Sequence, residues 1–88
     1  MSAFAVLVEV TLRPGIADPE GATIERALPA LGFDEVRGVS VGKAVRFEIE
    51  AADEAAARAR VAELCDRFLT NPVIEDAVVH VEAAGATV

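Results

Sequence analysis

Three segments of the chain alternate between apolar and polar residues, which is the pattern of β-strands with one buried face. In residues 3–13 one parity is apolar throughout, at Phe4, Val6, Val8, Val10 and Leu12. In residues 73–82 the apolar parity holds Ala77, Val79 and Val81. Both segments are therefore predicted to be strands, and the third segment requires a choice between two interpretations.

The third segment, residues 36–50, reads VRGVSVGKAVRFEIE. A hairpin turning at Gly42-Lys43 would divide its apolar residues between two faces of a sheet. One continuous strand keeps them on a single face: Val39, Val41, Val45, Phe47 and Ile49. We therefore expect one long strand, bent or bulged near Gly38 or Gly42. A strand of this length could also pair with a neighbouring subunit.

Two further segments follow the helical period. The first helix is predicted to begin at Asp18-Pro19, because Asp caps free backbone N–H groups and Pro suits the first helical position. Gly32 is expected to end this helix, and Pro29 to loosen its last turn, since Pro removes one backbone hydrogen bond. The apolar stripe of the helix consists of Ile24, Leu28 and Leu31.

The second helix is predicted to begin after Asp53, which can cap it, with Glu54 favourably placed in the first turn. Its apolar stripe consists of Ala57, Val61, Leu64, Cys65 and Phe68. Both helical stripes need cover, and a sheet face is the only large apolar surface that the pattern offers.

The predicted fold class is α+β in the order β-α-β-α-β. We expect an antiparallel three-stranded sheet with a long middle strand and both helices on one face, a reduced ferredoxin-like architecture. Residues 1–88 are expected to form a single domain, with a core over about residues 3–82 and a tail at 83–88.

The composition supplies more apolar residues than so small a fold can hide. The hydrophobic fraction is 53% in a chain of 88 residues, whereas about 45–50% is usual and a short domain buries a smaller share of its surface. Soluble monomers rarely expose large apolar patches. Part of this surface is therefore expected to contact another chain.

The formal net charge of −7 comes from 15 acidic and 8 basic residues. It argues against binding to nucleic acid or to an anionic membrane, both of which select clustered Lys and Arg. The lone Cys65 cannot form an internal disulfide, which favours a reducing, cytoplasmic setting. The N-terminal sequence lacks the features of a signal peptide, and its apolar run is too short for a membrane helix.

Candidate catalytic groups are few. His80 shares its parity with polar residues opposite the presumed core face, so we interpret it as solvated or at an interface. Cys65 lies on an apolar helical stripe and is interpreted as buried filler. No Cys and His residues have metal-ligand spacing, and neither Ser2 nor Ser40 has an evident His partner. No catalytic or metal-binding residue is therefore predicted.

Two short stretches remain of interest. Gly42-Lys43 lacks the context of a phosphate loop; it is either a bulge with a solvated Lys or a contact to a subunit or anionic ligand. Asn71-Pro72 ends the second helix sharply, because Pro disfavours helical geometry in the residue before it and cannot donate to a central strand. This corner is interpreted as a stiff structural feature that directs the last strand.

Several ordered motifs together resemble one family. They are VEVTLRPGIADPEGATIERALPALGF at 8–33, VGKAVRFEIE at 41–50 and LTNPVIED at 69–76. The chain is similar over about residues 3–82 to PurS, the small subunit of phosphoribosylformylglycinamidine (FGAM) synthase. Pro29 inside the first helix and the Ala-rich tail depart from the family pattern.

The resemblance implies a subunit without chemistry of its own, which forms homodimers or tetramers and bridges a glutaminase and an ATP-dependent synthetase. Together these would make FGAM from formylglycinamide ribonucleotide, glutamine, ATP and water, the fourth step of de novo purine synthesis. No cofactor is expected in this chain, since ATP and Mg²⁺ would lie on the synthetase. The residues that we expect to dock subunits are Gly42, Lys43, Asn71, Pro72, Val73, Ile74 and Glu75.

Two other functions fit a small α+β chain. One is a regulatory module that binds a small ligand at a dimer interface, which predicts a rise in melting temperature with that ligand. The other is a small enzyme working at a dimer cleft, which would require His80 or Cys65. Fold similarity alone does not separate them from an assembly subunit.

Overall fold

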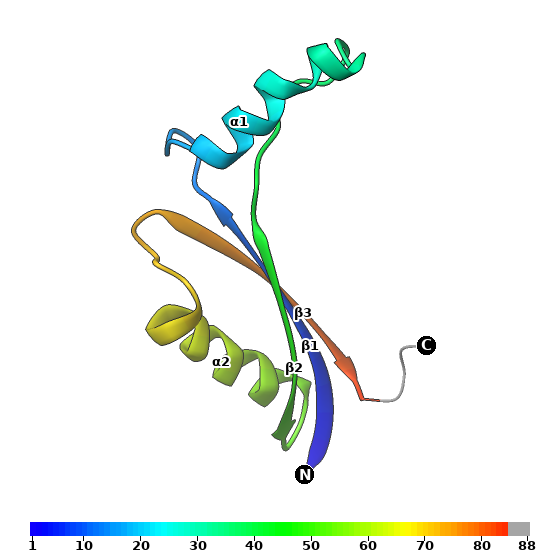
Figure 1. Ribbon diagram of the computed structural model, residues 1–88. Coiled ribbons are helices and arrows are strands. Elements are labelled where there is room, and N and C mark those ends of the chain that lie inside the picture. Colours follow the sequence, from blue (N-terminus) through cyan, green and yellow to red (C-terminus); the bar gives the residue numbers. More distant parts are fainter. Residues whose placement is uncertain (85–88) are drawn as a thin grey trace.

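Three strands form one antiparallel sheet in the computed structural model, which describes residues 1–84 (Figure 1). The strands are β1 (Ser2–Leu12), β2 (Lys43–Ala51) and β3 (Glu75–Ala83). Their order is β2-β1-β3, with β1 central and antiparallel to both neighbours. The predicted β-α-β-α-β order and antiparallel sheet are therefore confirmed. Of the expected tail, residues 85–88 lie outside the described part of the chain.

The core lies between one face of this sheet and helix α2 (Glu54–Leu64). The register places Val6 opposite both Phe47 and Val81, so the apolar parities of the three strands share one face. Val8 on β1 and Val61 on α2 are both 0% exposed. Asp53 caps α2 as expected, and its carboxylate accepts a hydrogen bond of 2.8 Å from Ala56 N.

The end of α2 differs from the predicted stripe. Residues Cys65–Leu69 form a π-type turn, closed by a 3.0 Å hydrogen bond from Thr70 N to Cys65 O. Such a turn holds one residue more than an α-turn. After Cys65 the next side chain packed against the core is Leu69, whereas Phe68 is 81% exposed. The prediction that Phe68 belongs to the buried stripe is wrong.

Helix α1 (Pro19–Ala27) begins as the sequence predicts but ends before Pro29, and the expected stop at Gly32 closes a separate short helix. The Asp18 carboxylate accepts from Gly21 N at 2.9 Å, and Pro19 takes the first helical position. Pro29 opens a short 3₁₀ helix, η1 (Pro29–Leu31), which confirms the loosened last turn. Gly32 then stops the segment in the left-handed region, at φ 95°.

The placement of α1 departs from the expected layer of two helices. Only α2 packs on the sheet; α1 stands beyond the end of β1 and makes its main helical contact with η1 (Figure 1). The expectation that both helices cover one face holds for α2 alone. The reason is that α1 packs on an extended segment of its own chain, residues 39–41.

That segment was predicted to be the first half of a long strand. The sheet pairing of β2 instead begins at Lys43, opposite Val10. Upstream, Val41 N donates to Asp18 Oδ2 and Val39 N to Glu25 Oε1, each at 2.9 Å. The long middle strand is therefore wrong before Lys43, because helix carboxylates take the place of a neighbouring strand. The chain still passes straight through Gly42-Lys43 without a hairpin.

We call residues 13–42 the arm, and β1, β2, α2, η2 (Cys65–Leu69) and β3 with their connections the body. The arm makes the molecule long and thin, with extents of 53 × 33 × 14 Å and a radius of gyration of 16.7 Å. A compact chain of this length would have a radius of gyration of about 12 Å. The accessible surface is 6232 Å², about 1,300 Å² more than the ~4,900 Å² of a compact monomer of this mass.

Candidate docking surfaces

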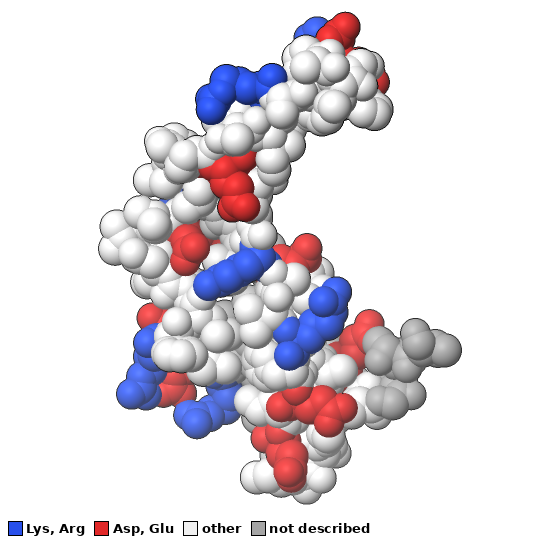
Figure 2. All heavy atoms as spheres, in the orientation of Figure 1, with Lys and Arg blue, Asp and Glu red and all other residues white. Residues whose placement is uncertain are grey.

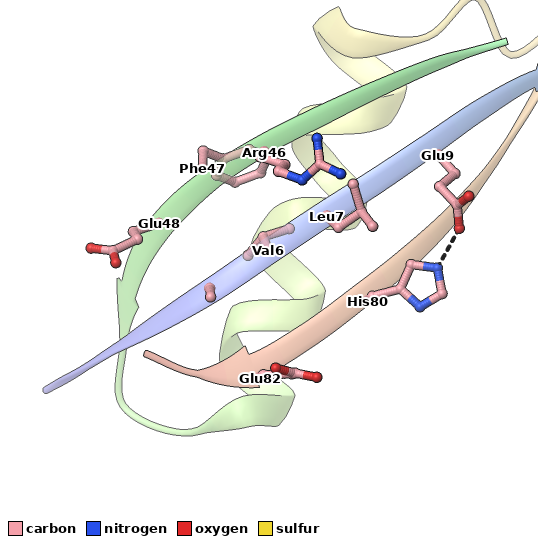
Figure 3. A pocket seen from close by; sticks show the side chains of 9 residues that line it. Val6, Leu7, Glu9, Arg46, Phe47, Glu48, His80 and Glu82 are labelled. Atoms are coloured by element: carbon pink, nitrogen blue, oxygen red, sulfur yellow. Dashed lines mark hydrogen bonds and ion pairs between the residues drawn. The ribbon is translucent and has the colours of Figure 1, made fainter. Parts of the chain in front are cut away.

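The face of the sheet opposite α2 carries a shallow groove of about 730 Å³ (Figure 3). Ala5 and Leu7 of the central strand form its apolar floor. Charged and polar side chains border it: Glu9, Arg46, Glu48, His80 and Glu82. This face combines an apolar centre with charges of both signs, which is the composition of a protein interface with a polar rim.

His80 lies in this groove as an exposed side chain, as its parity predicts. Its Nε2 is 2.6 Å from Glu9 Oε1 (Figure 3), and both side chains are about half exposed. A Glu–His pair can orient a general base. No Ser, Thr or Cys lines the described groove, so the pair has no nucleophile beside it.

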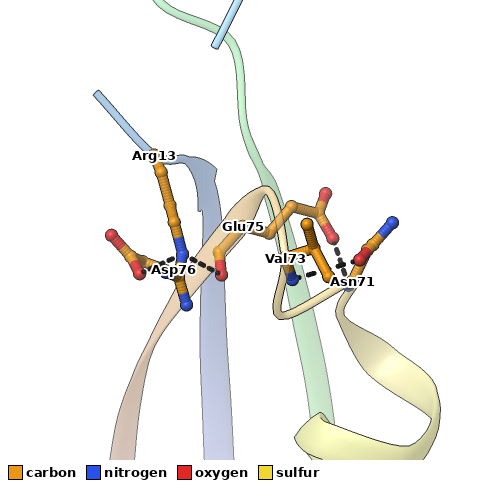
Figure 4. Close-up of polar contacts among 5 residues, drawn as sticks. All are labelled: Arg13, Asn71, Val73, Glu75 and Asp76. Atoms are coloured by element: carbon orange, nitrogen blue, oxygen red, sulfur yellow. Dashed lines mark hydrogen bonds and ion pairs between the residues drawn. The ribbon is translucent and has the colours of Figure 1, made fainter. Parts of the chain in front are cut away.

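The corner between α2 and β3 is closed on itself by hydrogen bonds (Figure 4). The Asn71 carbonyl accepts from Ile74 N at 3.0 Å and from Glu75 N at 2.8 Å. The Asn71 side chain accepts from Val73 N at 3.2 Å, and Glu75 Oε1 accepts from Asn71 N at 2.7 Å. The corner is therefore a preorganised loop, as its Asn-Pro sequence predicts.

Arg13 fixes this corner to the end of β1 (Figure 4). Arg13 N donates to Ile74 O at 2.8 Å, and Arg13 Nε lies 3.2 Å from Asp76 Oδ1. The sequence interpretation missed Arg13, because its partners are about sixty positions away along the chain. The tip of the corner is accessible to a partner, because Val73 is 78% exposed and Pro72 is also exposed.

Gly42-Lys43 lies at the same end of the sheet as the corner. Lys43 is opposite Val10 on one side of β1, and Glu75 is opposite Leu12 on the other side. Lys43 is exposed and makes no ion pair within residues 1–84. A Cβ added to Gly42 would lie 2.5 Å from Val10 O, so this position requires glycine for close backbone approach. The predicted docking residues thus share one end of the sheet.

A third surface lies on the arm. Of the predicted stripe Ile24, Leu28 and Leu31, only Leu28 is half-buried, whereas Ile24 is 42% and Leu31 69% exposed; Phe33, which was not assigned to the stripe, is 49% exposed. The sequence showed a helical apolar stripe here, but it did not show which part of the protein packs against that stripe. Periodicity shows which side chains share a face, and not which surface covers them.

Cys65, the first residue of η2, is buried directly after α2, as predicted. Burial, and to a smaller extent the neighbouring Asp66 carboxylate, raises the pKa of the Cys65 thiol above its usual value. A thiol with a raised pKa stays protonated near neutral pH, so Cys65 is a poor nucleophile. Within residues 1–84 no group of three or more His, Cys, Asp or Glu could hold a metal ion.

Charged side chains are dispersed over the surface. Figure 2 shows blue and red side chains intermixed on the face in view. Arg58, Arg60 and Arg67 of the second helical segment each pair with a glutamate of the same segment. The face in view therefore offers no basic stripe for a phosphate backbone. In residues 1–84 no helix has the length and apolarity needed to cross a membrane.

The fold and its three exposed surfaces define a small α+β protein suited to association with other chains. The sequence model of the family described as PurS: Phosphoribosylformylglycinamidine (FGAM) synthase matches residues 5–83. The chain is 42% identical over 69 residues to the phosphoribosylformylglycinamidine synthase subunit PurS of Synechocystis sp., which covers 78% of this chain and 69% of that relative.

Solved structures of PurS chains have the same fold as this chain. PurS from Methanocaldococcus jannaschii superposes with a TM-score of 0.82 at 38% identity, over 91% of this chain and 96% of that one. A chain of the PurLQS structure from Thermotoga maritima superposes with a TM-score of 0.85 at 33% identity, over 93% and 100%. The chain therefore belongs to the PurS family, the PurS subunits of FGAM synthase in purine biosynthesis.

Proposed function

We propose that this chain is the assembly subunit that bridges the glutaminase and the ATP-dependent synthetase of FGAM synthase, so that ammonia passes between them without escaping into water. The observation that carries the proposal is the surplus of about 1,300 Å² of surface over a compact monomer. The relative from Thermotoga maritima occurs in a structure named PurLQS, which supports binding to two larger subunits.

The chain contributes surfaces to the enzyme, and the reaction takes place on its partners. ATP and Mg²⁺ are bound by the synthetase, and this chain holds no cofactor. The rigid corner at 71–75 and the exposed Lys43 lie at one end of the sheet and offer a preorganised docking site. Preorganised surfaces lose less entropy on association. The setting is the cytoplasm, where the free thiol of Cys65 remains reduced.

Self-association, as a homodimer or tetramer, is the second part of the proposal. Within residues 1–84 of the single chain, the apolar side chains of the arm and the groove on the open sheet face both lack a covering element. Surfaces of this kind mark sites of protein contact. A symmetric assembly would cover them in every copy at once.

The bridging role is tested by reconstitution with the matching synthetase and glutaminase. FGAM formation is measured with glutamine and, separately, with ammonia, each with and without this chain. We expect the chain to raise the glutamine-dependent rate at least tenfold and to change the ammonia-dependent rate little. Equal glutamine-dependent rates with and without the chain would refute the proposal.

A further inference from the structure

Thr70, the residue directly before the corner at 71–75, is attached to the core through one carbonyl group. The Cys65 carbonyl accepts two hydrogen bonds of 3.0 Å from Thr70, one from its backbone N and one from its Oγ1. Cys65 is 5% exposed and belongs to the hydrophobic core, and Thr70 is half-buried. The start of the corner is therefore bound to the core at this point.

These two bonds replace the ordinary end of an α-helix. In an α-helix the Cys65 carbonyl would accept from the N–H group of Leu69, four residues on; here it accepts from Thr70 N, five residues on. Turns of this π type are rare and occur often at functional sites. Thr70 leaves the turn in an extended conformation, with φ −127° and ψ 159°, which β-branched residues favour. The hydroxyl and the β-branched carbon of Thr70 thus fix the turn and the direction in which the chain leaves it.

The corner takes its shape from the next residue, Asn71 (Figure 4). The carbonyl and the side chain of Asn71 accept hydrogen bonds from the N–H groups of residues 73–75. These bonds lie within the corner and set its shape. Its orientation on the body is set on the sheet side by Arg13, whose N donates to Ile74 O at 2.8 Å, and on the helical side by Thr70.

We propose that Thr70 is a positioning residue for FGAM formation: it holds the exposed tip of the corner, Pro72 and Val73, in the orientation that a larger subunit recognises. The inference rests on the proposed docking role of the corner and names the residue that aims it. A tip that is already oriented loses less entropy when a partner binds. Loss of the Thr70 hydroxyl should therefore weaken docking and leave the catalytic centres of the partners intact.

Substitutions at Thr70 in the full-length chain test this role. Thr70→Val removes the hydroxyl and keeps the β-branched shape, Thr70→Ser keeps the hydroxyl, and Thr70→Ala is a second variant without the hydroxyl in case Val disturbs the fold. Thr23→Val is the matched control, because Thr23 Oγ1 also donates to a backbone carbonyl, that of Pro19, at 2.8 Å. Val61→Ala, in the core, is the control for a loss of stability alone.

Each variant is titrated into the matching synthetase and glutaminase, and FGAM formation is measured with glutamine and with ammonia. Thr70→Val and Thr70→Ala should raise the chain concentration that gives half of the maximal glutamine-dependent rate by about fivefold, the effect of one lost hydrogen bond. Thr70→Ser and both controls should behave as the unchanged chain. The ammonia-dependent rate should be the same throughout.

Two kinds of failure are distinguishable in this experiment. Half-saturating concentrations that stay unchanged in Thr70→Val and Thr70→Ala would overturn the positioning role alone, as would an equal rise in Thr70→Ser or in Val61→Ala. An unchanged chain that does not raise the glutamine-dependent rate would refute the proposed bridging function, and the positioning role with it.

Discussion

At the scale of single residues, Asp18 connects the first helix to a segment far along the chain. One carboxylate oxygen accepts from Gly21 N and the other from Val41 N, both at 2.9 Å. These two N–H donors hold the pKa of Asp18 below its usual value of 3.8, because backbone hydrogen bonds favour the charged form. Asp18 therefore makes the stability of the arm dependent on pH.

The sign of that dependence is testable. A carboxyl whose folded pKa is depressed stabilises the fold above its unfolded pKa, and the contribution is lost as pH falls through the folded value. The contribution should thus be complete near neutral pH and decline below about pH 3.8. Asp18→Asn should lower the melting temperature by several degrees at neutral pH and by much less in strong acid. Thermal melts with Glu20→Gln as control check this, and an equal loss at every pH would contradict it.

Gly21 is buried where α1 packs on Val39, so no side chain larger than hydrogen fits at this position. Inside a helix Gly→Ala normally stabilises, by up to about 1 kcal/mol. Here the new Cβ would lie 2.6 Å from Val39 O, so Gly21→Ala should instead destabilise by about 1–3 kcal/mol, as overpacking does. Chemical denaturation measures the change, with exposed Glu20→Ala as the control. A stabilised Gly21→Ala protein would show that the arm is not held in this way.

At the scale of elements, the π-type turn after α2 decides which side chains support the core. Val61 is 0% exposed, whereas Phe68 is 81% exposed. Val61→Ala is therefore expected to cost about 2 kcal/mol of unfolding free energy, and Phe68→Ala less than about 0.5 kcal/mol. Urea denaturation of both variants checks the difference. A larger loss from Phe68→Ala would mean that the regular helical stripe, with Phe68 inward, is correct.

The end of the sheet that carries Lys43 and the corner is expected to position the partner subunits. Asn71→Ala removes the acceptor for Val73 N, and Lys43→Ala removes an exposed ammonium group. Each change should lower glutamine-dependent FGAM formation severalfold and leave ammonia-dependent formation unchanged, because only ammonia transfer depends on alignment. Arg67→Ala, on the exposed side of the second helical segment, is the control. Full glutamine-dependent activity in both variants would exclude this end as a docking site.

At the scale of the whole molecule, local signals predicted more than long-range ones. The caps at Asp18 and Asp53, the stop at Gly32 and the shared face of the strands all followed from short-range spacing. The hydrogen bond from Val41 N to Asp18 joins residues 23 positions apart. A contact over this distance does not appear as a periodic pattern in the sequence. The sequence therefore predicted a sheet face as the cover for Ile24, Leu28 and Leu31, whereas Ile24 and Leu31 are exposed.

The same limit applies to the docking surfaces. The Asn-Pro corner was predictable because its hydrogen bonds are local, whereas its attachment to β1 through Arg13 was not. The surplus of apolar residues could be counted from composition, but only the fold shows that it is concentrated on the arm and the open face of the sheet. These surfaces make association a property of the whole molecule.

Sedimentation velocity shows directly whether the chain associates with itself and with its partners. The purified chain, 9.2 kDa as a monomer, is measured alone and then with the matching synthetase and glutaminase. We expect it to sediment alone as a dimer or tetramer and to move into a larger, faster complex when both partners are present. A chain that stays a 9.2 kDa species in both experiments would show that it is a monomer that binds neither itself nor these partners.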